Sequence, residues 1–176
     1  NHWWFRGKRA IIATLLKQIM HKPVARALDI GCGSGFNARL LKPFVKKIIG
    51  LESSDQAIRQ AKQRSPELHI IKGVWPHAEI NGTFDIITCF DVLEHIRDDG
   101  AALHRIEQIL NPNGYVVMTV PAFPFLWSDH DTLASHFRRY TASALRDRIT
   151  KHTSLEIVRM TYFNSLLFLP ILLFRA

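Results

Sequence analysis

The sequence has few cysteines and lacks the signals of several protein classes. Its only two cysteines, Cys32 and Cys89, are too far apart in the chain to suggest a metal-binding pair, a redox pair or a disulfide framework. No signal-peptide core follows the aromatic and basic N-terminus, so we expect a cytoplasmic location. The apolar run 166–174 is too short to span a bilayer. It could pack in the core, dock a partner or touch a membrane surface.

Acidic residues are missing from the start of the chain, which has 23 Lys and Arg against 15 Asp and Glu and a net charge of +8. Residues 1–28 contain six basic residues and no acid, residues 29–110 sum to −1, and residues 111–176 sum to +3. A basic chain suggests a nucleic acid, a membrane surface or an acidic substrate as partner. No zinc finger and no basic helix followed by heptads is present, so nucleic acid is not favoured.

The composition is that of a globular protein, with 47% hydrophobic and 22% charged residues among 176. Short β-rich runs alternate with longer amphipathic stretches, as in βαβ units. We predict an α/β fold in one domain, residues 1–176, with a doubly wound, mostly parallel Rossmann-like sheet and helices on both faces. The predicted strands are 25–30, 47–51, 68–71, 85–90, 115–120 and 154–162. The predicted helices are 5–21, 34–43, 55–64, 98–110 and 141–151.

A glycine-rich turn, Asp29-Ile-Gly-Cys-Gly-Ser-Gly35, joins the first predicted strand to the following helix. Open α/β sheets bind ligands at this place, where glycines let a ligand approach the backbone. The third glycine comes one position earlier than in the dinucleotide fingerprint, and no Gly-Lys-Ser/Thr follows as in a P-loop. The Asp29 carboxylate beside this turn would repel a diphosphate, but it would suit a ligand that carries an ammonium group. Glu52, at the end of the second predicted strand, can accept both hydroxyl protons of a ribose, which leaves NAD and other adenosyl ligands open.

Five motifs in order resemble those of class I S-adenosylmethionine-dependent methyltransferases over residues 24–121. They are Asp29–Gly35, Glu52, Phe84-Asp-Ile-Ile87, Phe90-Asp-Val-Leu-Glu-His95 and Leu110-Asn-Pro-Asn-Gly114. The ends of the chain, in His2–Gly7, Leu126–Asp131 and His136–Thr141, look like a bacterial subgroup of small-molecule or lipid-type methyltransferases. The resemblance implies S-adenosylmethionine as cofactor, S-adenosylhomocysteine as product, and a small-molecule or lipid-linked acceptor. The basic ends would suit an anionic one.

The resemblance divides the expected domain into an N-terminal helix or lid (1–22), a cofactor-binding core (23–121) and substrate-side elements (122–176). The cofactor contacts that it implies are Asp29, Gly31, Cys32, Gly33, Glu52, Ser53, Val74, Trp75, Phe90 and Asp91. Asp29 would lie near the methionine amino group, Glu52 would hold the ribose, and Phe90 and Asp91 would border the sulfonium. The acid that this family often has after the third strand is absent here. The adenine would then meet the Val74 backbone and the face of Trp75, unless Trp75 belongs to the core.

The long segment 121–140 is predicted to be irregular and to face the acceptor, because it follows a strand at the ligand-binding edge. We predict His130, Asp131 and His136 as catalytic residues, with a histidine as general base. A purely hydrogen-bonded loop is the alternative. The same three residues do not make a convincing metal cluster, so no metal is predicted. Arg138 and Arg139 could bind a phosphate or carboxylate, or could be solvated.

The N-terminal aromatic residues Trp3, Trp4 and Phe5, beside Arg6, could close over the cofactor as a lid or could simply pack. Two other functions stay open. An RNA or protein methyltransferase would suit the charge, although no Asn-Pro-Pro-Tyr-type signature is present. A non-catalytic adenosyl-nucleotide-binding module would also retain Asp29 and Glu52. Asn1 and the apolar last residues would fit a piece of a longer protein, and no oligomeric state is predicted.

Overall fold

A computed structural model describes residues 3–163 of the chain, with side chains from Gly7 onward. The chain divides into two compact units. The first unit comprises Asn1–Cys89 and Ile109–Val117, and the second comprises Phe90–Gln108 and Met118–Ala176. The expected single domain over residues 1–176 stays a prediction.

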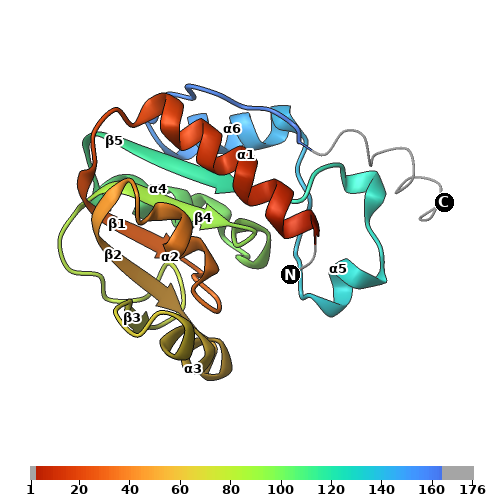
Figure 1. The fold of residues 1–176 in the computed structure, drawn as a ribbon. Helices are drawn as coiled ribbons and strands as arrows, with labels where there is room; N and C mark the ends of the chain where they lie inside the picture. Colours follow the sequence, from red (N-terminus) through yellow and green to blue (C-terminus); the bar gives the residue numbers. More distant parts are fainter. Residues whose placement is uncertain (1–2, 164–176) are drawn as a thin grey trace. The chain divides into compact units, whose positions relative to one another are not determined.

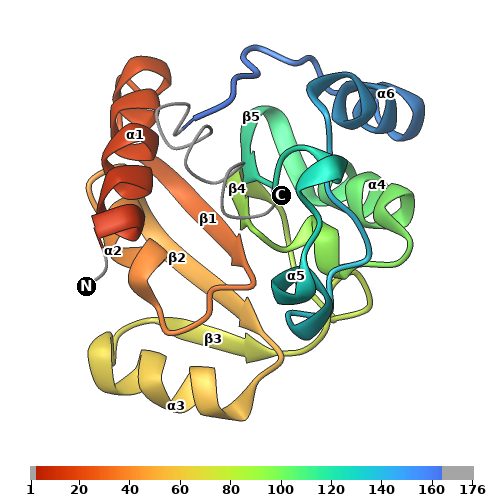
Figure 2. The same ribbon diagram turned by 90° about the vertical axis from the view of Figure 1, so that its right-hand side faces the viewer.

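A five-stranded sheet confirms the predicted α/β fold. Its strands lie in the order β3-β2-β1-β4-β5, with bounds β1 Val24–Ile30, β2 Val45–Glu52, β3 His69–Lys72, β4 Phe84–Phe90 and β5 Leu110–Thr119. β1 pairs in parallel with β2 and with β4, and β2 pairs in parallel with β3. Figure 2 shows the arrows of β1, β2 and β3 directed to the same edge of the sheet. Residues that follow β1 and β2 therefore meet there.

The core of the first unit is built on β1, whose last four residues, Ala27–Ile30, are buried. Leu28, Asp29 and Ile30 of β1 are fully buried, as expected for a parallel strand covered on both faces. Three helices belong to this unit, α1 Trp3–Ile19, α2 Phe36–Leu41 and α3 Asp55–Arg64 (Figure 1). α1 contacts α2, and α3 contacts both β2 and β3. Ser54 caps the start of α3, since its side chain accepts a hydrogen bond from the Ala57 N–H.

The second unit is mainly helical. It contains η1 Leu93–His95, most of α4 Asp99–Ile109, and then η2 Pro124–Leu126, α5 Asp129–Leu133 and α6 Ala142–His152. Leu93, Leu103 and Ile106 are buried in it. α4 and α6 approach closely at Gly100, where a Cβ atom would lie 2.5 Å from the His152 ring. A side chain at this position would have to displace that imidazole.

Two predictions about secondary structure are wrong. The sixth strand, 154–162, does not form, although Leu155 and Ile157 are half-buried between exposed neighbours, as in a strand. Hydrogen bonds that involve side chains hold this segment, in place of backbone pairing with a neighbouring strand. Glu107 accepts hydrogen bonds from Ser154, and the Tyr162 hydroxyl accepts one from the Ala142 N–H. The segment 121–140 is not irregular throughout, because η2 and α5 form within it.

None of the helices among residues 3–163 is long and apolar enough to cross a bilayer. The apolar run 166–174, for which core packing, a partner and a membrane surface are the alternatives, lies outside the described residues. The side chains of Trp3, Trp4, Phe5 and Arg6 lie outside them as well.

Candidate functional site

The glycine loop after β1 has a left-handed backbone at all three glycines, with φ of 66° at Gly31, 54° at Gly33 and 79° at Gly35. Residues with a side chain rarely adopt such angles. A Cβ on Gly33 would meet no atom within 4 Å, whereas a Cβ on Gly35 would lie 3.3 Å from that of Ala61. Gly33 therefore presents its backbone to open space, and Gly35 lets the loop pack against α3.

Glu52 joins the end of β2 to this loop. One of its carboxylate oxygens, Oε2, accepts a hydrogen bond from the Gly33 N–H across 2.9 Å. The other, Oε1, accepts from the Ser53 and Ser54 N–H groups, each across 2.8 Å, and from the Ser53 hydroxyl across 3.4 Å. The structure thus brings together three predicted cofactor residues, Gly33, Glu52 and Ser53. A carboxylate fixed in this way can turn its remaining acceptor capacity toward ribose hydroxyls.

Asp29 is fully buried beneath the loop, where Thr88 of β4 donates a hydrogen bond to its Oδ1 across 2.7 Å. Among the described residues, none is hydrogen-bonded to its Oδ2. Burial raises the pKa of Asp29 to about 7, against the lowering effect of Thr88, and the charge of Glu52 adds to the rise. A buried carboxylate with one unsatisfied oxygen fits a cationic ligand group better than a phosphate.

The other predicted cofactor residues of the first unit differ in access. The Cys32 side chain is buried against Gly50, where a Cβ would lie 2.6 Å from the Cys32 sulfur, so only its backbone remains for a ligand. Burial and the charges of Asp29 and Glu52 raise the pKa of the Cys32 thiol to about 12. Trp75 is buried and Val74 is 61% exposed. The core alternative for Trp75 is therefore favoured, and Val74 is the accessible residue of the two.

Arg64, at the end of α3, was not anticipated as a site residue. Its guanidinium donates a hydrogen bond to the Ser34 carbonyl in the glycine loop across 2.7 Å. The same group stacks over the Phe36 ring, with Cζ 3.9 Å from the ring centre, while Arg9 of α1 lies 5.0 Å from that centre. Phe36 holds the place of the last glycine in a dinucleotide fingerprint. No spacing rule links residues 34 and 64, so only the fold could reveal this contact.

In the second unit, Asp91 stands directly after β4 with an unusual backbone. Its φ is 55°, a left-handed value that is uncommon for a residue with a side chain. Thr119 holds it there: the Thr119 hydroxyl donates to the Asp91 carboxylate across 2.8 Å, and the Asp91 N–H donates to the Thr119 carbonyl across 2.9 Å. Backbone strain maintained by two hydrogen bonds is typical of a binding site. Phe90, the preceding predicted contact, is buried.

The segment 121–140 brings two of the three predicted catalytic residues together. The His136 Nδ1 lies 2.9 Å from the Asp131 carboxylate, which is fully buried and also accepts hydrogen bonds from Arg139 and Ser128. Burial alone would raise the pKa of Asp131, but these hydrogen bonds outweigh it and hold the pKa at about 2. The third predicted catalytic residue, His130, is exposed in α5, and the histidine beside Asp131 is His136 instead.

The capping box of α5 helps to fix the Asp131 carboxylate. The Asp131 carboxylate accepts from the Ser128 N–H, and the Ser128 side chain caps the first turn of α5. A serine followed three residues later by an acid is a sequence signal for a helix start, and it could have identified α5.

His136 also contacts a second histidine. The centre of the His95 ring lies 4.6 Å from that of His136, in an edge-on arrangement. No short-range pattern points to that pairing.

Arg138 and Arg139 both pair with buried carboxylates, although Arg138 keeps 25% of its side chain exposed. Arg138 lies 2.7 Å from the buried Asp99 carboxylate, and Arg139 lies 2.8 Å from Asp131. The Tyr140 hydroxyl donates to Asp99 as well, across 2.9 Å, and burial together with that hydrogen bond raises the pKa of Tyr140. These residues hold the second unit together.

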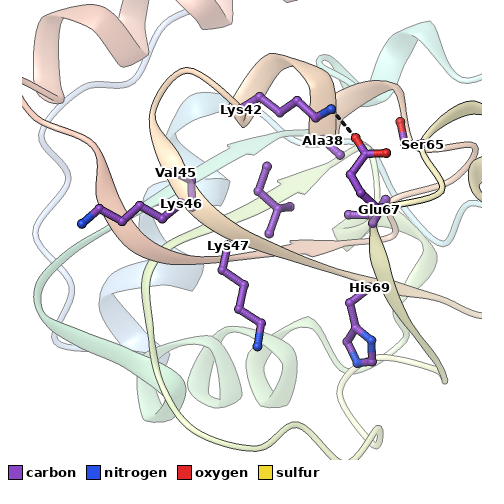
Figure 3. A pocket seen from close by; sticks show the side chains of 10 residues that line it. Ala38, Lys42, Val45, Lys46, Lys47, Ser65, Glu67 and His69 are labelled. Carbon is purple, nitrogen blue, oxygen red and sulfur yellow. Dashed lines mark hydrogen bonds and ion pairs between the residues drawn. The ribbon is translucent and has the colours of Figure 1, made fainter.

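A hollow of about 290 Å³ opens at the opposite edge of the sheet, between the start of β2 and α2 (Figure 3). Lys46 and Lys47 line it together with Lys42 and Glu67, which pair with each other, and with His69. This edge is remote from Glu52 along β2, so the hollow is not the cofactor site.

A family model described as a methyltransferase domain matches residues 1–160. The chain belongs to this methyltransferase family. The match covers both the glycine loop and the segment around His136, so it includes residues of both units. It confirms the resemblance seen in the motifs.

Relatives with assigned names agree with the family. The ubiquinone biosynthesis O-methyltransferase of Albidiferax ferrireducens is 28% identical over 136 residues, which is 66% of this chain and 52% of that protein. A probable S-adenosylmethionine-dependent methyltransferase of Mycolicibacterium smegmatis is 24% identical over 122 residues, 69% of this chain and 46% of that protein. The chain thus spans about half the length of the curated relatives that it matches.

Solved structures share the fold. YcgJ from Bacillus subtilis has a TM-score of 0.69 at 21% identity, covering 80% of this chain and 66% of that one. CalS10, an amino pentose methyltransferase from Micromonospora echinospora with bound S-adenosylmethionine, has a TM-score of 0.60 at 25% identity, covering 67% of this chain and 51% of that one.

Proposed function

We propose that this domain binds S-adenosylmethionine and transfers its methyl group to a small-molecule acceptor. The hydrogen bond from the Gly33 N–H to Glu52 carries the proposal, because it sets open glycine backbone beside a carboxylate suited to a ribose. The unsatisfied oxygen of Asp29 supports an ammonium-bearing ligand over a diphosphate. The cofactor would supply the chemistry, since its sulfonium carries an activated methyl group.

The roles that we assign to the chain are binding and orientation, which can supply most of the rate of a transfer between two bound groups. Asp29, Gly31, Cys32, Gly33, Glu52, Ser53, Val74, Phe90 and Asp91 would contact the cofactor. His136 would face the acceptor, and Asp131 would be a positioning residue that holds its imidazole. We do not retain His130 as a catalytic residue. It is exposed, and the histidine hydrogen-bonded to Asp131 is His136.

An apolar or lipid-linked acceptor is the finer part of the proposal. The segment 121–140 exposes several large apolar side chains, namely Phe125, Trp127, Leu133 and Phe137. Arg97 stacks on Phe137 with Cζ 5.1 Å from the ring centre, which adds a positive charge beside apolar surface. Such surface fits an apolar acceptor with an anionic group. The relative named for ubiquinone biosynthesis agrees with this class, whereas the one named for an amino pentose represents a polar one.

Calorimetric titration with S-adenosylmethionine, S-adenosylhomocysteine and NAD tests the cofactor. Preference for NAD over both adenosyl ligands would overturn the proposal. Turnover is then followed as S-adenosylhomocysteine formed with quinone, lipid, amino sugar and RNA acceptors. Product with a quinone or lipid acceptor is expected, and product with RNA alone would favour the RNA alternative. Tight cofactor binding without product from any acceptor would favour a non-catalytic binding module.

A further inference from the structure

Three metal-ligating side chains of the second unit gather from two segments of the chain. Glu94 and His95 lie in η1, and His136 follows α5. One ligand atom from each lies within 4.8 Å of the others. The backbone supports this arrangement, because the Phe137 N–H donates a hydrogen bond to the Glu94 carbonyl across 2.8 Å. The two segments are therefore joined beside the side chains that converge.

The two imidazoles are each held through hydrogen bonds. Asp131 occupies the Nδ1 side of His136, which leaves Nε2 for another partner, and Arg139 and Ser128 in turn fix Asp131. His95 interacts with the backbone of Ser135 and Ala134. Histidines that bind metals almost always have their second nitrogen held by a carboxylate, a carbonyl or water. The groups that would orient metal ligands are thus already in place.

We propose that Glu94, His95 and His136 form a binding site for a divalent transition-metal cation. Two imidazoles and one carboxylate are typical ligands of Zn²⁺, Mn²⁺ or Fe²⁺, whereas Mg²⁺ and Ca²⁺ prefer oxygen ligands. With only three protein ligands, a fourth coordination position stays open for water or a substrate oxygen. This inference does not rest on the proposed function, since the cation would bind whether or not a methyl group is transferred.

The distances require only a small closure. Ligands about 2.1 Å from a tetrahedral ion lie about 3.4 Å from one another, so atoms that are up to 4.8 Å apart must approach by at most about 1.4 Å. His95 is the exposed member of the set, while Glu94 is buried and His136 is only 12% exposed. The ion would thus reach the site from the side of His95 and settle against the two less accessible ligands.

This set differs from the one considered from the sequence, which was His130, Asp131 and His136. Asp131 is engaged by Arg139 at 2.8 Å, so it serves as a positioning residue for His136 rather than as a ligand. The rival explanation of the cluster is packing alone, since edge-on contact between His95 and His136 is favourable without an ion. The two explanations differ in whether a cation binds and in which residues affect it.

The test is direct metal binding by the full chain, free of any affinity tag and stripped with a chelator. Zn²⁺ and Mn²⁺ are titrated against a competing chelator, Co²⁺ is followed by its visible absorption, and Mg²⁺ serves as comparison. We expect one high-affinity Zn²⁺ per chain and no competition from Mg²⁺ at equal concentration. Absence of stoichiometric binding of Zn²⁺, Mn²⁺ and Co²⁺ would overturn the inference.

Variants locate the ion. Glu94→Gln and His95→Gln should each lower the affinity for Zn²⁺ at least tenfold and alter the Co²⁺ spectrum, and Asp131→Asn should lower the affinity by about 10–100-fold through His136. His130→Ala and His104→Ala are matched controls, because both remove exposed histidines of the same unit. Circular dichroism and cofactor titration confirm that each variant is folded. Unchanged Zn²⁺ affinity in folded Glu94→Gln and His95→Gln would show that the cluster is packing only.

Discussion

The Gly33 N–H donates a hydrogen bond to the Glu52 carboxylate across 2.9 Å, although Gly33 follows β1 and Glu52 ends β2. The parallel pairing of β1 with β2 brings Ile30 opposite Leu51, and the ends of both strands therefore meet at one edge. A ligand that inserts there finds an open backbone and a carboxylate that are already aligned. Most of our predictions concern this edge.

Replacing Glu52 by alanine should weaken S-adenosylmethionine binding by about 1–3 kcal/mol, because charged hydrogen bonds to the ribose are lost. Calorimetric titration measures the change. Glu67→Ala is the control, since it removes an exposed carboxylate of the same unit at the opposite edge. Equal losses in the two variants, or none in Glu52→Ala, would remove Glu52 from the site.

Asp29 should make the domain less stable as the pH rises toward neutrality. Its pKa is about 7 in the folded state and 3.8 without the fold, so between pH 4 and pH 7 the folded state holds more protons than the unfolded one. The free energy of unfolding then falls across this window, by on the order of 4 kcal/mol at most. Urea unfolding at pH 5 and pH 8 measures the decline, which Asp29→Asn should remove. A decline of the same size in Asp29→Asn would assign it to other groups.

Gly33 and Gly35 should respond differently to alanine. Both substitutions force a left-handed angle on alanine at a cost of about 1–2 kcal/mol. Only Gly35→Ala also meets Ala61 at 3.3 Å, so its thermal midpoint should fall further. Gly33→Ala should stay folded yet lose cofactor affinity, because its methyl group points into open space. Full affinity in Gly33→Ala would mean that no ligand approaches there.

Arg64 should act as a positioning residue for the glycine loop. Arg64→Ala removes the hydrogen bond to Ser34 and the stacking on Phe36, so cofactor affinity should fall by roughly fivefold or more while the domain stays folded. Arg64→Lys, which keeps the charge but loses the planar group, should recover little. Arg59→Ala, on an exposed position of α3, is the control in the same titration. Full rescue by lysine would show that charge alone matters.

Tyr140→Phe should destabilise the second unit by about 1–3 kcal/mol, because the buried Asp99 carboxylate loses a hydrogen-bond donor. Tyr162→Phe should cost less, since the hydroxyl there accepts from the Ala142 N–H at an exposed site. Urea unfolding compares the two. An equal loss of unfolding free energy in both variants would show that the hydrogen bond to the buried Asp99 stabilises the protein no more than the exposed one does.

Much of the first unit could be predicted because its signals are local. Alternating apolar periods indicated the helices and five strands, and the turn at Asp29–Gly35 indicated the ligand edge. The prediction of a strand at 154–162 was wrong. The alternation of exposed and half-buried residues is present, but hydrogen bonds of Ser154 with Glu107 and of Tyr162 with Ala142 hold the segment in place of a neighbouring strand. Likewise α5 was missed because the pairing of Ser128 with Asp131 was not considered.

The sequence by itself determined the α/β alternation, the methyltransferase motifs and the carboxylates Asp29 and Glu52, since each depends on residues close together in the chain. Tertiary structure alone decided the contacts between distant segments. It set Arg64 against the glycine loop, buried Trp75, engaged Arg138 with Asp99, and joined His136 to Glu94 and His95. Those contacts depend on where the backbone of one segment meets another, and no local pattern encodes that meeting.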